Sequence, residues 1–111
     1  MHSEKNYPVR KQVSSIDVAL PDGVRDEAYL ETLDWLLPRS IEGFAPDLVF
    51  YNAGVDPHEN DRLGRLSLTD QGLKDRDRRV FSFFRKRGIA VASVLGGGYS
   101  RDIEAVAGRH L

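Results

Sequence analysis

Cysteine is absent from the 111 residues of this chain, so disulfide bonds and thiolate metal sites are excluded. No apolar run approaches the roughly 20 residues that are needed to span a bilayer. Neither sign of charge dominates, and a net charge of -1 argues against electrostatic binding of nucleic acid. The first residues, 1–11, are polar and basic and do not form a signal peptide. We therefore expect a cytoplasmic protein that binds neither membranes nor nucleic acid directly.

The remaining residues predict alternating strands and helices in a single domain. We expect strands at 14–20, 47–52 and 89–95, and helices at 26–44, from Thr69 to Gly88, and at 101–109. Pro38 should kink or interrupt the first helix, and the charged run 74–79 should form the wet face of the second. The order β-α-β-α-β-α indicates an α/β fold with parallel strands buried on both faces. Three helices can barely cover such a sheet, which suggests a piece of something larger.

The first informative loop follows the apolar run 47–52. It reads Tyr51-Asn52-Ala53-Gly54-Val55-Asp56-Pro57-His58 and continues to Asp61-Arg62-Leu63-Gly64. Ligands bind at the carboxyl edge of parallel sheets, so Asp56 is placed for a metal-binding or base role. The same carboxylate also suits a cap of the turn before Pro57, and the residues alone leave both interpretations open. His58 leads into a polar run, so we expect an exposed loop histidine.

The second informative loop follows the apolar run 89–95 and reads Leu95-Gly96-Gly97-Gly98-Tyr99. Three glycines allow the backbone to approach a ligand closely. The loop has neither the Lys-Ser/Thr that follows a phosphate-binding P-loop nor a G-x-G-x-x-G pattern. A phenol such as Tyr99 is neutral at pH 7 and can donate a hydrogen bond to a developing oxyanion. A tight turn that carries a surface tyrosine is the alternative interpretation.

Together, the two loops resemble the histone deacetylase superfamily, above all its bacterial deacetylase-like and class IV branches. The segments Asn6-Tyr7-Pro8 and Ser15-Ile16-Asp17-Val18-Ala19-Leu20-Pro21 resemble the same family, so the resemblance covers nearly the whole chain in order. It implies an arginase/deacetylase-like α/β fold, three-layered around a central parallel sheet. Residues 1–111 would be a C-terminal fragment of that domain, with 1–12 irregular and 13–111 α/β.

The resemblance also implies roles for particular residues. Asp56 would be the last zinc ligand, and Tyr99 would hydrogen-bond the acyl oxygen as the tetrahedral intermediate forms. Gly97 and Gly98 would line the acyl channel. The activity would be the zinc-dependent removal of acetyl groups from lysine, a polyamine or a small amine metabolite.

Two family motifs are missing from this sequence. The Asp-x-His zinc-ligand pair and the His-His general-base dyad lie earlier in the family's domain, and no His-His occurs here. Asp56-Pro57-His58 cannot replace the pair, because its context matches the other loop. Zinc would need further ligands from outside the chain, and no base is available to activate water, so we expect no activity from the chain alone. The alternatives are a non-catalytic module that binds or self-associates through an open sheet edge, or one half of a split enzyme.

Overall fold

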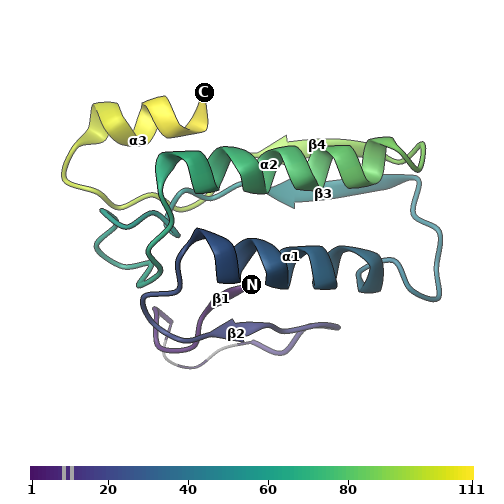
Figure 1. Cartoon of the computed structure of the whole chain (residues 1–111), viewed down its shortest axis with the longest axis horizontal. Coiled ribbons are helices and arrows are strands. Elements are labelled where there is room, and N and C mark those ends of the chain that lie inside the picture. The colour runs from purple at the N-terminus through teal and green to yellow at the C-terminus, as the bar shows by residue number, and fades with distance from the viewer. Residues whose placement is uncertain (9, 11) are drawn as a thin grey trace.

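A computed structural model describes all residues of the chain except 9 and 11. Figure 1 shows its elements, which follow one another in the order β1 (His2–Ser3), β2 (Ala19–Leu20), α1 (Asp26–Arg39), β3 (Leu48–Asn52), α2 (Asp70–Arg85), β4 (Ala90–Val94) and α3 (Ile103–His110). The strands form two separate pairs, β1 with β2 and β3 with β4, and both pairs are parallel. The expected α/β class with parallel pairing is therefore confirmed. Within the described residues, no helix is long and apolar enough to cross a membrane.

The two long helices form the core with one face of the β3–β4 pair. α1 packs against α2, and α2 packs against β4 (Figure 1). The buried apolar side chains that α1 and α2 contribute are Tyr29, Leu30, Leu33, Leu37, Leu73, Val80 and Phe84. They recur at helical spacing, which is why the sequence predicts both helices. Thr69 caps α2 as expected, because its hydroxyl accepts a hydrogen bond from the Gly72 N–H at 3.0 Å.

The other face of the β3–β4 pair is uncovered, which contradicts the expectation of strands buried on both faces. The register pairs Leu48 with Ala90 and Phe50 with Ala92, so these side chains share one face. Phe50 is 74% exposed, and Leu48 is exposed as well. A parallel strand reads as a continuous apolar run whether or not its second covering layer lies in the same chain. The run alone therefore could not show that the layer is missing here.

The N-terminal part differs from the expected strand 14–20. Only Ala19–Leu20 is a strand, because the Asp17 carboxylate accepts hydrogen bonds from the Ser14 N–H and hydroxyl and holds 14–17 in a turn. Residues 1–12, expected to be irregular, contain the partner strand His2–Ser3. Positions 9 and 11 of that segment lie outside the described residues.

The first helix also ends five residues earlier than expected. α1 stops at Arg39, one residue after Pro38; the Ser40 N–H still bonds to the Leu36 carbonyl at 2.9 Å, but the N–H groups of Ile41 and Glu42 reach back only three residues. Short turns then carry the chain to Gly43, whose φ of 84° suits a residue without a side chain. α3 agrees closely with the expected 101–109, and its Ile103 is exposed.

Candidate functional site

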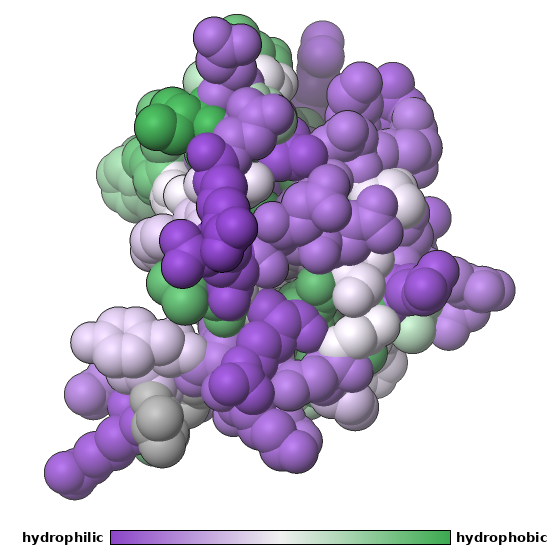
Figure 2. Space-filling view, turned by 90° about the vertical axis from the view of Figure 1, so that its left-hand side faces the viewer, coloured by the Kyte–Doolittle hydropathy of each residue, from purple (hydrophilic) through white to green (hydrophobic). Residues whose placement is uncertain are grey.

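The two informative loops leave the same edge of the β3–β4 pair. Both strands run in the same direction and are paired residue by residue from Leu48–Ala90 to Asn52–Val94. The backbone hydrogen bonds continue beyond the strands, with Ala53 N–H to the Val94 carbonyl at 2.9 Å and Val55 N–H to the Gly97 carbonyl at 2.6 Å. The two loops are therefore neighbours in the structure. Figure 2 faces this end of the molecule, which is mainly hydrophilic with apolar groups between the polar ones.

Asp56 lies over the glycines of both loops. A Cβ atom added to Gly54 would lie 2.6 Å from Asp56 Oδ1, and one added to Gly97 would also lie 2.6 Å from that oxygen. Neither position has room for a side chain while the carboxylate stays in place. Burial raises the pKa of Asp56, and the neighbouring Asp61 carboxylate raises it further. The protein therefore holds this carboxylate where its negative charge is poorly solvated, a common property of functional sites.

Tyr99, in the second loop, lies beside Gly97 as well. A Cβ atom on Gly97 would lie 3.2 Å from Tyr99 Cε2, so the aromatic ring and the Asp56 carboxylate flank one point above Gly97. The side chain of Tyr99 is 51% exposed. Gly98 faces elsewhere, because its Cβ position lies within 3 Å of Val55 and Val106 side-chain atoms. Of the two glycines expected to line a channel, Gly97 is thus the one beside Asp56, and the channel role of both stays a prediction.

A cavity of about 460 Å³ opens beside Asp56. Asp56 and Gly97 line it at the sheet edge, and α1 lines the opposite side with Tyr29 and apolar residues such as Leu33. Tyr99 does not line this cavity. The two predicted site residues therefore meet at Gly97, with Asp56 turned toward the cavity and Tyr99 toward solvent.

Arg76 is a part of the site that sequence reasoning missed. The run 74–79 was expected to be a wet helix face, but Arg76 is buried, and its Nη1 donates to the Gly54 carbonyl at 2.6 Å. Its Nε pairs with Asp77 Oδ1 at 2.8 Å, and Tyr51 donates its hydroxyl to the same oxygen at 2.5 Å. Burial raises the pKa of Tyr51, so this hydroxyl remains a donor. Helical spacing could have revealed Arg76, because it lies three residues after Leu73 and four before Val80 on the buried face.

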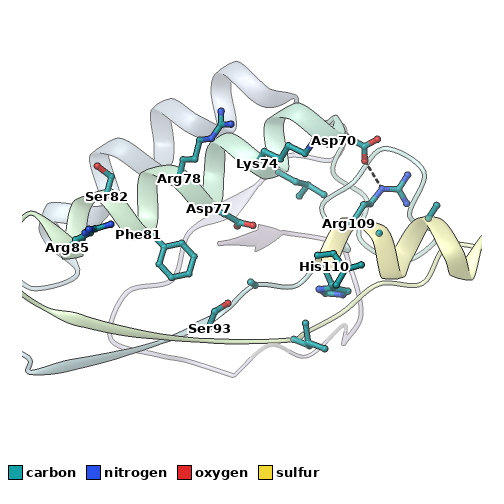
Figure 3. A pocket seen from close by; sticks show the side chains of 16 residues that line it. Asp70, Lys74, Asp77, Arg78, Phe81, Ser82, Arg85, Ser93, Arg109 and His110 are labelled. Atoms are coloured by element: carbon teal, nitrogen blue, oxygen red, sulfur yellow. Dashed lines mark hydrogen bonds and ion pairs between the residues drawn. The ribbon is translucent and has the colours of Figure 1, made fainter.

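His58 is buried, so the expectation of an exposed loop histidine is wrong. Its Nδ1 accepts a hydrogen bond from the Asn60 N–H at 3.0 Å, and its Nε2 lies 3.1 Å from Asp70 Oδ1. This pairing places the ring proton on Nε2, toward the carboxylate. Arg109 binds the same oxygen at 2.8 Å and lowers the pKa of Asp70 (Figure 3). Nε2 of His58 thus ties the first loop to α2, and through Asp70 to α3, while Nδ1 is engaged within the loop.

A larger cavity of about 900 Å³ lies between α2, β4 and α3. Figure 3 shows the charged side chains around it, among them Lys74, Arg78 and Arg85 of α2 and Arg109 of α3. Neither Asp56 nor Tyr99 lines this cavity. Asp56 lines the smaller cavity, so we place the candidate site there, at the carboxyl ends of β3 and β4.

The donor set at this site does not suffice for zinc. In the part of the chain that the structure describes, no three His, Cys, Asp or Glu side chains are grouped so that they could hold a metal ion. A catalytic zinc normally has three protein ligands. Asp56 fits as one of them, since a poorly solvated carboxylate gains from a nearby cation. Asp56 alone would therefore not hold a zinc ion.

Comparison with known sequences identifies the family. The model of the histone deacetylase domain matches residues 1–110. An uncharacterized protein of Picosynechococcus is 46% identical over 110 residues, which are 99% of this chain and 37% of that protein. Histone deacetylase 2 of Arabidopsis thaliana is 37% identical over 97 residues, which are 87% of this chain and 25% of that protein. The chain thus spans between a quarter and two fifths of the length of these relatives.

Solved structures show the same fold. The chain superimposes on a homologue of histone deacetylases from Aquifex aeolicus with a TM-score of 0.75 at 25% sequence identity, over 88% of this chain and 28% of that one. The fold is therefore that of the arginase/deacetylase proteins, as the resemblance of the loops implies. With the domain match over nearly every residue, these findings show that the chain belongs to the histone deacetylase family.

Proposed function

We propose that this chain carries part of the site of a zinc-dependent deacylase. Asp56 would supply one zinc ligand, and Tyr99 would donate a hydrogen bond to the acyl oxygen as negative charge develops there. When bound, zinc would polarise the acyl carbonyl and activate a water molecule. The observation that carries the proposal is the meeting of a half-buried carboxylate and a phenol over Gly97, at the carboxyl ends of two parallel strands.

Gly97 is the feature that brings the two side chains together. Any side chain at this position would meet Asp56 Oδ1 at 2.6 Å and the Tyr99 ring at 3.2 Å. A glycine here therefore lets the carboxylate and the phenol approach each other this closely. The proposed channel, lined by Gly97 and Gly98, would take an acetylated amine such as acetyl-lysine, a polyamine or a small metabolite.

The chain alone should not catalyse the reaction. It offers one zinc ligand, and His58, the histidine nearest in sequence to Asp56, has both ring nitrogens engaged by Asn60 and Asp70. Neither nitrogen of His58 is therefore free to act as general base. Purified chain with added zinc and an acetyl-lysine peptide should show no turnover. Metal-dependent turnover that Asp56→Asn abolishes would contradict the expectation that the site is incomplete in this chain.

A chimera tests the proposed roles directly. The chain would replace the segment that it matches in Arabidopsis histone deacetylase 2, so that the remaining three quarters of that protein supply the other motifs. We expect zinc-dependent deacylation of at least one acetylated amine, a strong loss with Asp56→Asn, and a fall in kcat with Tyr99→Phe. An exposed tyrosine, Tyr7, provides the matched control Tyr7→Phe. Equal activity of the Tyr99→Phe and Tyr7→Phe chimeras would remove Tyr99 from the mechanism.

The uncovered sheet face supports a second candidate function, a self-associating module. Leu48 and Phe50 on β3 and Val94 on β4 expose apolar surface, and neither outer edge of this pair is bonded to another strand among the described residues. Unpaired edges and apolar faces favour association with further chains. Light scattering should then report dimers or larger species, and Phe50→Glu should shift the chain toward monomer. Ile103→Glu, at an exposed apolar residue on α3, is the control, and a monomeric wild-type chain would exclude this candidate.

A further inference from the structure

The carboxylate of Asp61 joins the two loops of the site. Its Oδ1 accepts hydrogen bonds from the backbone N–H groups of Leu63 at 2.8 Å and Gly64 at 2.9 Å. Its Oδ2 accepts the backbone N–H of Tyr99 at 2.6 Å, across 38 positions of sequence. One oxygen therefore closes the first loop on itself, while the other holds the second loop.

The first loop in turn rests on the backbone of Asp56. Gly64 is buried, and a Cβ atom added to it would lie 1.6 Å from the Asp56 carbonyl oxygen. The segment from Asp61 to Gly64 is thus pressed against the residue that carries the candidate zinc ligand. Through Asp61, this contact continues to the backbone of Tyr99.

Tyr99 needs such a tie because little else fixes it. The side chain is half exposed, and three consecutive glycines before it leave the backbone unusually free to rotate. The hydrogen bond from Val55 N–H to the Gly97 carbonyl fixes the loop two residues earlier. A hydrogen bond to a carboxylate is stronger than one to a neutral acceptor, and this one is donated by the tyrosine's own N–H.

We propose that Asp61 is a positioning residue that holds Tyr99 in place, so that its phenol stays over Gly97 beside Asp56. This inference rests on the proposed function, in which the Tyr99 hydroxyl must meet the acyl oxygen. Small displacements of such a group are costly, because the hydrogen bond has to match the place where charge develops. Asp61 itself does not touch the substrate.

The test uses the isotope-labelled 111-residue chain and compares Asp61→Ala with Glu59→Ala, a truncation of an exposed acidic residue in the same loop. In the wild type, we expect a protected Tyr99 amide and a nuclear Overhauser contact between the Tyr99 ring and the Gly97 backbone. Asp61→Ala should reduce the hydrogen-exchange protection of Tyr99 by about tenfold or more, as for the loss of one charged hydrogen bond, and should abolish the ring contact. Glu59→Ala should change neither.

The amide of Val55 serves as an internal reference, because its acceptor on Gly97 is untouched. It should stay protected in Asp61→Ala. Persistence of the ring contact in Asp61→Ala would overturn the proposal. Loss of Val55 protection together with that of Tyr99 would also overturn it, since Asp61 would then hold the whole sheet edge. Neither readout requires turnover, so an inactive chimera would refute the proposed function while leaving the link between Asp61 and Tyr99 measurable.

Discussion

Replacing Arg76 by methionine should destabilise the chain far more than the same change at Arg79. Both residues lie on α2 and pair with an aspartate, but the side chain of Arg76 is 5% exposed and that of Arg79 is 40% exposed. Arg76 also holds the Gly54 carbonyl, two residues before Asp56. Methionine keeps the apolar stem and removes only the charge and its hydrogen bonds.

The magnitude follows from the burial of the partners. Removing one partner of a fully buried ion pair costs about 3–5 kcal/mol. The Asp77 side chain is 35% exposed and can regain water, so we expect a smaller cost, about 2–3 kcal/mol of unfolding free energy. Arg79→Met breaks an exposed pair with Asp34 and should cost less than about 1 kcal/mol.

Urea unfolding followed by circular dichroism measures both values. Arg76→Lys should fall between wild type and Arg76→Met, because one ammonium keeps the charge but lacks the fork that reaches both Gly54 and Asp77. Equal stability of Arg76→Met and Arg79→Met would refute the reasoning. It would mean that the buried guanidinium contributes no more than a surface charge does.

Three further predictions concern the site loops. Burial raises the pKa of Asp56 in the folded chain, so ionisation of this carboxyl opposes folding. Asp56→Asn should therefore raise the unfolding free energy at neutral pH. This gain in stability should vanish as the pH falls below the ordinary aspartate pKa of 3.8, where the carboxyl is protonated in both states. Gly64→Ala should lower stability by about 1–3 kcal/mol, because its Cβ would overlap the Asp56 carbonyl, whereas Gly108→Ala, in open space on α3, should raise it slightly. His58→Leu should cost about 1–3 kcal/mol in urea unfolding, because it leaves a backbone donor without its acceptor. A pH-independent effect of Asp56→Asn, or equal outcomes for the two glycines, would contradict these arguments.

Local signals in the sequence were sufficient for the elements that position the site. The apolar runs before both loops, the cap at Thr69 and the spacing of Leu73, Val80 and Phe84 all depend on neighbours within a few residues, and each appears in the structure. The expected strand at 14–20 is an exception, because only Ala19–Leu20 forms a strand. There the side chain of Asp17 competes with the alternating pattern for the backbone.

The remaining features depend on contacts between distant segments. Burial of His58 requires Asp70 and Arg109, and burial of Arg76 requires the carbonyl of Gly54, which precedes it by 22 positions. The hydrogen bond that Tyr99 N–H donates to Asp61 also joins two segments that are distant in the sequence. Helical spacing can mark Arg76 as buried, but no periodicity or short motif records which distant group each of these residues binds.

The exact pairing of β3 with β4 also limits which length changes the chain can accept. Each residue in a strand advances the backbone by about 3.3 Å and turns its side chain to the opposite face. Deleting one residue within Ala90–Val94 would therefore draw the glycine loop back from Asp56 by about that distance and interchange its inward and outward positions. Insertions and deletions should be tolerated at 40–46, on the far side of the sheet, and rejected within either strand.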